Sequence, residues 1–94
     1  MVIDRTFRDR ETEVLYATGR SKRFQSCVRQ AFQKLRMIDA AKQLTDLSAL
    51  PGNRLEALKG DRRGQYSVRI NDRYRACFEW RGSDAYEVGV TDYH

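Results

Sequence analysis

Residues 54–80 read RLEALKGDRRGQYSVRINDRYRACFEW, and this stretch decides the fold. Apolar and polar residues alternate in Gln65–Ile70 and again in Arg73–Trp80, which is the period of β-strands. Asn71-Asp72 lies between these runs and predicts a two-residue turn, because both residues tolerate positive φ. The stretch therefore predicts a β-hairpin.

Shorter elements are expected on both sides of the hairpin. Arg54–Leu58 is predicted to be a short strand, Gly60–Gly64 a basic loop and Ala85–Thr91 a last strand. Upstream, Thr45–Asn53 is predicted to be a connection with a turn at Pro51-Gly52. These segments supply about four strands in the second half of the chain.

The first half predicts a strand followed by two helices. Val2–Phe7 is expected to form the strand, and Asp9–Ala17 a short helix with Gly19 as its C-cap. Ser21 is placed to cap a second helix that ends by about Leu44. Its apolar stripe recurs at steps of three and four residues: Phe24, Cys27, Val28, Ala31, Phe32, Leu35, Ile38 and Ala41.

This order predicts one α+β domain over residues 1–94, with two N-terminal helices on one face of a small, mainly antiparallel twisted sheet. Side-chain alternation assigns a core face to Tyr66, Val68, Ile70, Tyr74, Ala76, Phe78, Trp80, Tyr86, Val88 and Val90. The open face is assigned Arg69, Arg73, Arg75, Cys77, Glu79, Thr91 and Tyr93. A row of arginines on that face predicts contact with phosphate.

Composition indicates a globular chain whose clustered bases suit either a polyanion such as nucleic acid or an acidic protein. Of its 94 residues 40% are apolar and 33% charged, and the formal net charge is +5. Arg20–Arg36 holds six bases and no acid, which fits either a solvated helix face or contact with a nucleic-acid backbone. No apolar run suits a membrane helix or a signal peptide, so a cytoplasmic protein is expected, with Cys27 and Cys77 reduced.

The pattern NRLEALKGDRRGQYSVRINDRYRACFEW, with VTDYH at the carboxyl end, resembles the HigB branch of the RelE-type bacterial toxins. The resemblance covers nearly the whole chain. It implies a RelE-like fold and the toxin of a type II toxin–antitoxin pair, which cleaves mRNA in the ribosomal A site. Cleavage uses the 2′-hydroxyl as the attacking group, with no metal or other cofactor.

The same resemblance implies the partners. These are a HigA-like antitoxin with a helix-turn-helix, mRNA in the A site, and 16S and 23S ribosomal RNA. Operator DNA is reached only through the antitoxin, since such pairs commonly repress their own operon.

The resemblance also assigns site residues. Lys59 of LKGD matches a position for RNA cleavage or binding, and Arg75 of YRACF matches the arginine near the scissile phosphate. Asp92, Tyr93 and His94 match the terminal catalytic group. Some HigB toxins have a histidine where this chain has Glu56, and a related subgroup carries glutamate there. Further RNA contacts are expected from Arg62, Arg63, Arg69 and Arg73.

Cleavage by internal attack needs a base, a cation beside the phosphorane and an acid for the leaving oxygen. His94 is the only histidine, which excludes a pair of imidazoles. The hypothesis is that Glu56 or Asp92 is the base, Arg75 with Arg73 and Lys59 steadies the phosphorane, and His94 or Tyr93 donates the proton. The imidazole suits this work because its ordinary pKa is ~6.5.

Two other functions fit the same residues. A non-catalytic module that binds RNA or the ribosome would use the basic face without proton transfer. A protein-interaction module would turn that face toward an acidic partner. Growth arrest on induction separates the protein-interaction module from the two functions that act on RNA or the ribosome. Mapping of mRNA 5′ ends separates cleavage of RNA from binding alone.

Overall fold

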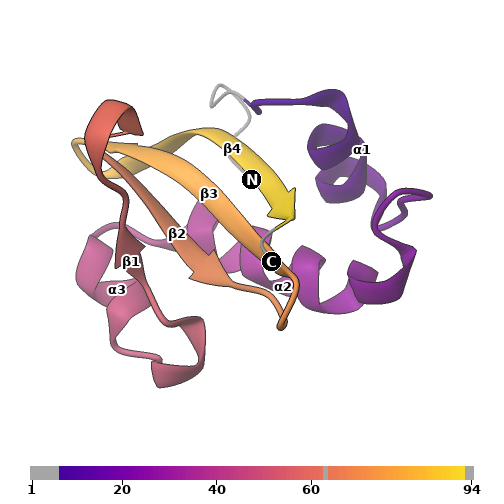
Figure 1. Cartoon of the computed structure of the whole chain (residues 1–94), viewed down its shortest axis with the longest axis horizontal. Coiled ribbons are helices and arrows are strands. Elements are labelled where there is room, and N and C mark those ends of the chain that lie inside the picture. The colour runs from indigo at the N-terminus through magenta and orange to yellow at the C-terminus, as the bar shows by residue number, and fades with distance from the viewer. Residues whose placement is uncertain (1–6, 63, 93–94) are drawn as a thin grey trace.

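The computed structural model describes residues 7–62 and 64–92. A helical layer lies behind one face of a four-stranded antiparallel sheet of order β1-β2-β3-β4 (Figure 1). This is the α+β architecture predicted from the sequence. The helices are α1 (Arg10–Thr18), α2 (Val28–Ala40) and α3 (Leu44–Ser48), and the strands are β1 (Glu56–Ala57), β2 (Gln65–Arg69), β3 (Tyr74–Arg81) and β4 (Asp84–Asp92).

The predicted first strand, Val2–Phe7, lies outside the described residues except at its last position. Phe7 forms an isolated parallel bridge with Val88, and the Arg8 N–H donates to the Val88 carbonyl at 2.9 Å. The chain therefore runs beside the outer edge of β4 before α1 begins.

Helix α1 has the ends that its sequence predicts. The Asp9 carboxylate caps it by accepting the Thr12 N–H at 2.8 Å. Gly19 adopts the left-handed conformation at φ 72° and donates its N–H to the Leu15 carbonyl at 2.8 Å. The predicted glycine C-cap is confirmed.

The second helix begins later than its apolar stripe suggests. Ser21 Oγ accepts the Phe24 N–H at 3.0 Å, and a 3₁₀ turn over Gln25–Cys27 precedes α2. The prediction that Thr45–Asn53 is only a connection was wrong, because α3 lies partly within it. The Asp46 carboxylate accepts the Lys42 and Gln43 N–H groups and so starts this short helix.

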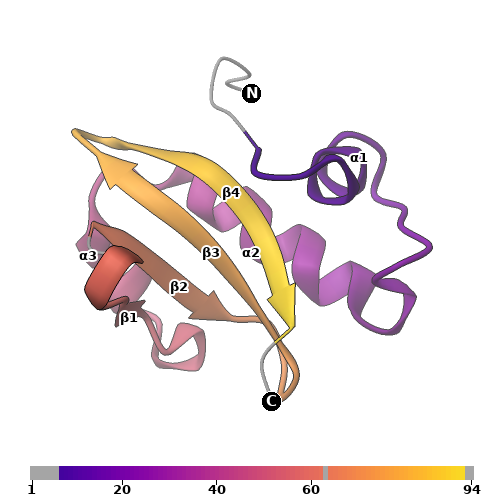
Figure 2. The same cartoon turned by 45° about the horizontal axis from the view of Figure 1, so that its top comes forward.

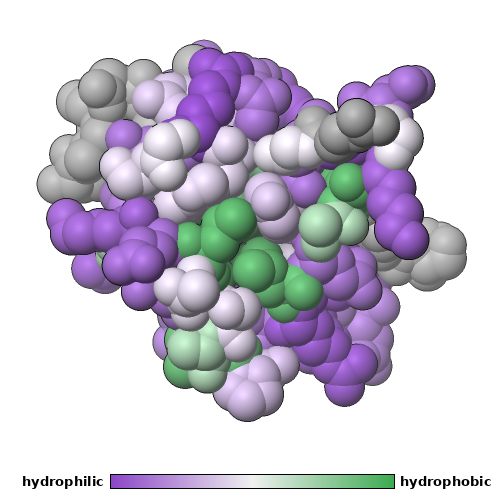
Figure 3. All heavy atoms as spheres, turned by 90° about the vertical axis from the view of Figure 1, so that its left-hand side faces the viewer, coloured by the Kyte–Doolittle hydropathy of each residue, from purple (hydrophilic) through white to green (hydrophobic). Residues whose placement is uncertain are grey.

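The core lies between the helices and one face of the sheet, and the turned view shows β3 and β4 crossing in front of α2 (Figure 2). Phe78 at 0% exposure and Val68 at 1% belong to the same buried cluster as Leu35 and Ile38 of α2. Apolar side chains also gather in the middle of the surface on the side of α3 and β1 (Figure 3). Leu50, which follows α3, is 47% exposed.

The hairpin turn differs from the one predicted. Asn71 and Asp72 are not among the residues with positive φ, so the two-residue positive-φ turn was wrong. The turn instead spans Asn71–Arg73, and the Asn71 side-chain oxygen accepts the N–H groups of Arg73 and Tyr74 at 2.9 and 2.8 Å. Asparagine is needed here as an acceptor for the backbone.

A β-bulge in β4 changes one predicted face. Cys77 pairs with Gly89 but Glu79 pairs with Tyr86, so β4 has one extra residue between these pairs. Glu87 takes φ 53° within that bulge. Tyr86, predicted in the core, therefore turns to the open face, where the Arg81 guanidinium lies 4.6 Å from its ring centre. Ala85 takes the core position at 1% exposure.

Asn53 is a buried polar residue that fixes the segment before β1. Its amide nitrogen donates to the Leu47 carbonyl at 3.0 Å, and its side-chain oxygen accepts a hydrogen bond from the Lys34 ammonium. Asn53 is 0% exposed, so the polar atoms of its amide depend on these two hydrogen bonds. This residue ties α2 and α3 to the strand side of the molecule.

The variant Asn53→Ala is expected to lower the free energy of unfolding by about 1–3 kcal/mol, because it removes both hydrogen bonds of a buried amide. Urea unfolding followed by circular dichroism measures this loss. Gln30→Ala, on the exposed side of α2, is the control and should change the value by less than about 0.5 kcal/mol. Equal stability of the two variants would contradict the role of Asn53.

Candidate active site on the open face of the sheet

Strand register brings two predicted arginines together on the face away from the helices. Arg69 of β2 pairs directly with Arg75 of β3, and Arg75 pairs with Thr91 of β4. Paired residues project on the same side of a sheet. The expectation that Arg69, Arg75 and Thr91 share the open face therefore agrees with the register.

Arg75 is held against the sheet. Its Nε donates to Ser67 Oγ at 2.8 Å, and its Nη2 donates to the Arg54 carbonyl at 2.5 Å. Its side chain is only 11% exposed, and the Glu56 carboxylate lies 3.8 Å from Nη2. The guanidinium is thus fixed between β2 and the segment before β1, with one acid beside it.

A polar hollow opens beside this arginine. Its volume is about 340 Å³, and its walls come from the β1 segment, the end of β2, the hairpin turn and β3. Three cationic and two acidic side chains line it, which leaves a local excess of positive charge. The lining residues are Arg54, Glu56, Arg69, Asn71, Asp72 and Arg75.

Lys34 of α2 adds a cation that sequence reasoning did not assign to the site. Burial lowers the pKa of the Lys34 ammonium, and repulsion from the Arg69 guanidinium lowers it further. Arg69 itself is ion-paired with Asp72 across the hairpin turn. Arg69 lines the hollow and Lys34 does not, so Lys34 adds a positive charge near Arg69 without forming part of the wall.

Arg73 was predicted to share the open face with Arg75, but the structure places it elsewhere. It belongs to the turn before β3, so strand alternation does not apply to it, and its guanidinium lies 5.2 Å from the ring centre of Tyr74. That ring packs edge-on against Phe24 of the helical layer. The open-face assignment of Arg73 was wrong for this reason.

Asp92 is bound to Arg73. Nε and Nη2 of Arg73 donate to the Asp92 carboxylate at 3.0 and 2.9 Å, and this hydrogen bonding raises the pKa of Arg73. Asp92 pairs in register with Tyr74, so its side chain leaves β4 on the helix side. The structure thus separates Arg73 and Asp92 from Glu56 and Arg75.

The remaining predicted residues lie around or beyond the hollow. Lys59 is exposed after β1, and its carbonyl accepts the Arg62 N–H at 3.3 Å in a 3₁₀ turn. Neither residue lines the hollow. Arg63, Tyr93 and His94 lie outside the described residues.

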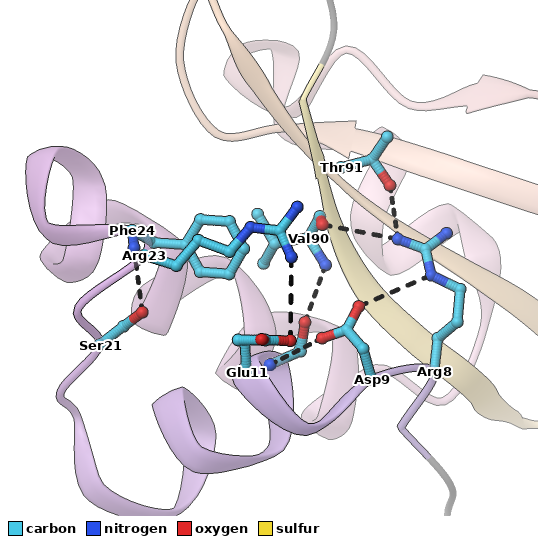
Figure 4. A network of polar contacts seen from close by, with 9 residues as sticks. Arg8, Asp9, Glu11, Ser21, Arg23, Phe24, Val90 and Thr91 are labelled. Atoms are coloured by element: carbon cyan, nitrogen blue, oxygen red, sulfur yellow. Dashed lines mark hydrogen bonds and ion pairs between the residues drawn. The ribbon is translucent and has the colours of Figure 1, made fainter.

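Arg8 is a further cation on the open face, and Figure 4 shows its guanidinium reaching Thr91. Its Nη2 donates to Thr91 Oγ1 at 2.6 Å. A Cβ at Gly89 would lie 2.6 Å from Nε of Arg8, so the missing side chain at Gly89 makes room for the guanidinium. The pairing of Thr91 with Arg75 places Arg8 on the far side of Thr91 from Arg75. No periodicity in the sequence indicated this contact, because Arg8 lies outside the regular elements.

An antiparallel sheet with helices on one face and guanidinium groups on the other is the architecture expected of RelE-like toxins. The family model described as the RelE-like toxin HigB of type II toxin–antitoxin systems matches residues 5–94. The chain belongs to this family. It is therefore the toxin of a type II pair and has an antitoxin partner.

Two relatives agree with the family. Toxin HigB-1 of Vibrio cholerae is 38% identical over 76 residues, which cover 79% of this chain and 80% of the relative. Endoribonuclease HigB of Proteus vulgaris is 34% identical over 61 residues, which cover 65% of each chain. An uncharacterized protein of Haemophilus influenzae is 35% identical over 52 residues, 55% of this chain and 52% of its own.

Two further observations concern the described part of the chain. No helix there has the length and apolar character needed to cross a membrane. Within residues 7–62 and 64–92, no three side chains of His, Cys, Asp or Glu are grouped so that they could hold a metal ion.

The variant Gly89→Ala should displace the Arg8 guanidinium, because the new methyl group occupies its place. The guanidinium is the end of a flexible side chain, so the expected loss of stability is only about 0.5–1.5 kcal/mol, the value of one hydrogen bond. Nuclear magnetic resonance of the Arg8 Nε–H group, with urea unfolding, measures both effects. Gly52→Ala is the control, because a Cβ at Gly52 meets nothing within 4 Å. An unchanged Arg8 signal would refute the contact.

Proposed function

We propose that the chain is an endoribonuclease that cleaves mRNA in the ribosomal A site and so stops translation. The name of the Proteus vulgaris relative, an endoribonuclease, supports the reaction class. The observation that carries the proposal is the placement of the Glu56 carboxylate 3.8 Å from the Arg75 guanidinium at the wall of one polar hollow. A base and a cation at that spacing suit attack on a phosphodiester.

In the proposed reaction, the 2′-hydroxyl of the RNA attacks the adjoining phosphorus. Glu56 takes the hydroxyl proton, and Arg75 stabilises the extra negative charge of the phosphorane. The bond from phosphorus to the 5′-oxygen then breaks, leaving a 2′,3′-cyclic phosphate and a 5′-hydroxyl. The nucleophile is part of the substrate, so the mechanism invokes no metal-bound water.

Glu56 is favoured over Asp92 as the base. The Glu56 carboxylate is 60% exposed and faces the hollow, so a ribose hydroxyl can reach it. The Asp92 carboxylate accepts two hydrogen bonds from Arg73 on the helix side of the sheet. Asp92 is proposed to orient Arg73 and the last two residues of the chain.

The acid that protonates the leaving oxygen is proposed to be His94, with Tyr93 as the second choice. Only His94 has an ordinary pKa close to neutrality. Lys59, Arg62, Arg63, Arg69 and Arg73 are proposed to bind the RNA on both sides of the scissile phosphate, as phosphate contacts supply most of the affinity for nucleic acid.

The proposed partners are a HigA-like helix-turn-helix antitoxin and the 16S and 23S RNA that surround the A site. Operator DNA would be bound only through the antitoxin. The net charge of +5 supports an electrostatic attraction to ribosomal RNA. The proposed location is the cytoplasm, where ribosomes and mRNA are found.

Arg75→Ala should reduce ribosome-dependent cleavage by about 10²–10³-fold, the usual cost of removing one group that stabilises transition-state charge. Glu56→Gln should reduce it by about 10²–10⁴-fold, since it removes the base while keeping the side-chain shape. Single-turnover cleavage of mRNA on purified ribosomes, with primer extension to map the new 5′ ends, measures both rates.

Arg81→Ala is the matched control. Arg81 stands on the same strand and face as Arg75, six residues away, a distance of about 20 Å along β3. The cleavage rate of the Arg81→Ala variant should lie within about twofold of the wild-type rate. Full cleavage by Arg75→Ala would overturn the assignment. Ribosome binding by the wild-type chain with no new 5′ ends would favour the non-catalytic binding module instead.

A further inference from the structure

Arg54 has a backbone conformation that its residue type disfavours. Its φ of 45° and ψ of 56° lie in the left-handed region, which side chains other than glycine seldom adopt. Such strain persists only where neighbouring contacts enforce it, and it gathers at functional sites.

Several contacts hold Arg54 in this conformation. Its N–H donates to the Pro51 carbonyl at 3.2 Å, and its own carbonyl accepts from Arg75 at 2.5 Å. The preceding residue, Asn53, is buried and hydrogen-bonded on both sides of its amide. The backbone is thus fixed, while the Arg54 side chain is exposed at the rim of the hollow.

The three arginines that line the hollow differ in their acid partners. Arg69 is paired with Asp72, and Arg75 has Glu56 at 3.8 Å. Within residues 7–62 and 64–92, no acidic side chain is paired with the Arg54 guanidinium. Arg54 therefore presents an uncompensated charge to a ligand in the hollow.

A second cation, Lys34, is close enough to Arg69 to be repelled by it, although it does not line the hollow. The Lys34 ammonium donates to the amide oxygen of Asn53, which carries no charge. Lys34 is partly buried and is repelled by Arg69. An anion near Arg69 would relieve that repulsion, because opposite charge stabilises both cations.

We propose that the part of the hollow lined by Arg54 and Arg69 is a subsite for the RNA phosphate next to the scissile one, which lies at Glu56 and Arg75, and that Arg54 contacts this neighbouring phosphate. The proposal rests on the proposed function and deepens it, since it names residues that hold the substrate beside the reacting atoms. Arg54 is an RNA-binding and positioning residue here, and Arg75 remains at the scissile phosphate.

A phosphodiester suits the hollow better than a neutral ligand. The lining includes arginines from three segments of the chain, and guanidinium groups match the geometry of phosphate oxygens. Glu56 and Asp72 neutralise two of the three arginine charges in the lining. A ligand with a single negative charge therefore matches the remaining positive charge. Arg75 lines the same hollow as Arg54, so one strand of RNA can place successive phosphates beside the two arginines.

The test compares the full chain with three variants, Arg54→Gln, Arg54→Gly and Arg81→Gln. Each binds a short single-stranded RNA that carries 2′-O-methyl riboses, which cannot be cleaved by 2′-attack. Arg54→Gln is expected to weaken binding about tenfold at low salt. The slope of log affinity against log salt should fall by about 0.7, the share of one phosphate contact to a single strand. Arg81→Gln should keep the affinity and the slope.

Arg54→Gly separates binding from folding. Glycine accepts the left-handed backbone, so the melting temperature should equal or exceed that of wild type while RNA binding weakens about as much as in Arg54→Gln. Lower melting temperature together with unchanged RNA affinity would mean a structural role only and would overturn the subsite.

The remaining outcomes are equally decisive. Equal losses in Arg54→Gln and Arg81→Gln would indicate a general charge effect and would overturn the subsite. Unchanged RNA binding by Arg54→Gln, with weaker binding of the antitoxin, would assign the hollow to a protein carboxylate instead. The assay needs no cleavage, so the subsite can stand if the chain proves to be inactive. Conversely, normal cleavage with Arg54-independent binding would refute the subsite and leave the proposed function intact.

Discussion

The fixed position of the Arg75 guanidinium is the interaction on which the candidate site depends. It joins β3 to Ser67 of β2 and to the carbonyl of Arg54, so it ties the sheet to the irregular segment before β1. A guanidinium has five donors in a rigid plane and can make such contacts while keeping one edge toward a ligand. The small Ser67 side chain and the left-handed turn at Arg54 both serve this arrangement.

One face of the sheet packs on the helices and the other carries the candidate site. Two irregular features of β4 decide which side chains lie on each face. The bulge at Glu87 turns Tyr86 outward and Ala85 inward. The absence of a side chain at Gly89 lets Arg8 lie over β4. Both features concern β4, which ends at Asp92, one of the residues that the family resemblance assigns to catalysis. The open face is therefore a surface built from several strands and one preceding segment.

The sequence predicted the site best where strand alternation applies. Arg69 and Arg75 share the open face because they stand within regular strands, and their register follows from the hairpin. Arg73 was misplaced because it stands in the turn, where Asn71 sets the path of the backbone. Arg54, Lys34 and Arg8 were not assigned to the site, since each reaches it from a turn, a helix or an extended segment.

The electrostatics of the site likewise depend on tertiary contacts. Asp92 and Glu56 were equal candidates for the base when only residue types were considered. The structure gives them different surroundings, since Asp92 is bound by Arg73 while Glu56 faces the hollow near Arg75. Lys34 gains its altered pKa from burial and from Arg69, which is 35 positions away in the chain.

The sequence by itself determined the α+β class, the antiparallel hairpin and the family, because hydrophobic periodicity and short patterns are local properties of the chain. Only the tertiary structure decided which charges meet. The Arg54 carbonyl, the Ser67 hydroxyl and the Arg75 guanidinium come from three segments, and the distance between them depends on how β1 and the preceding loop pack on the sheet. Packing of that kind follows from the sum of many contacts, so no pattern within one segment predicts it.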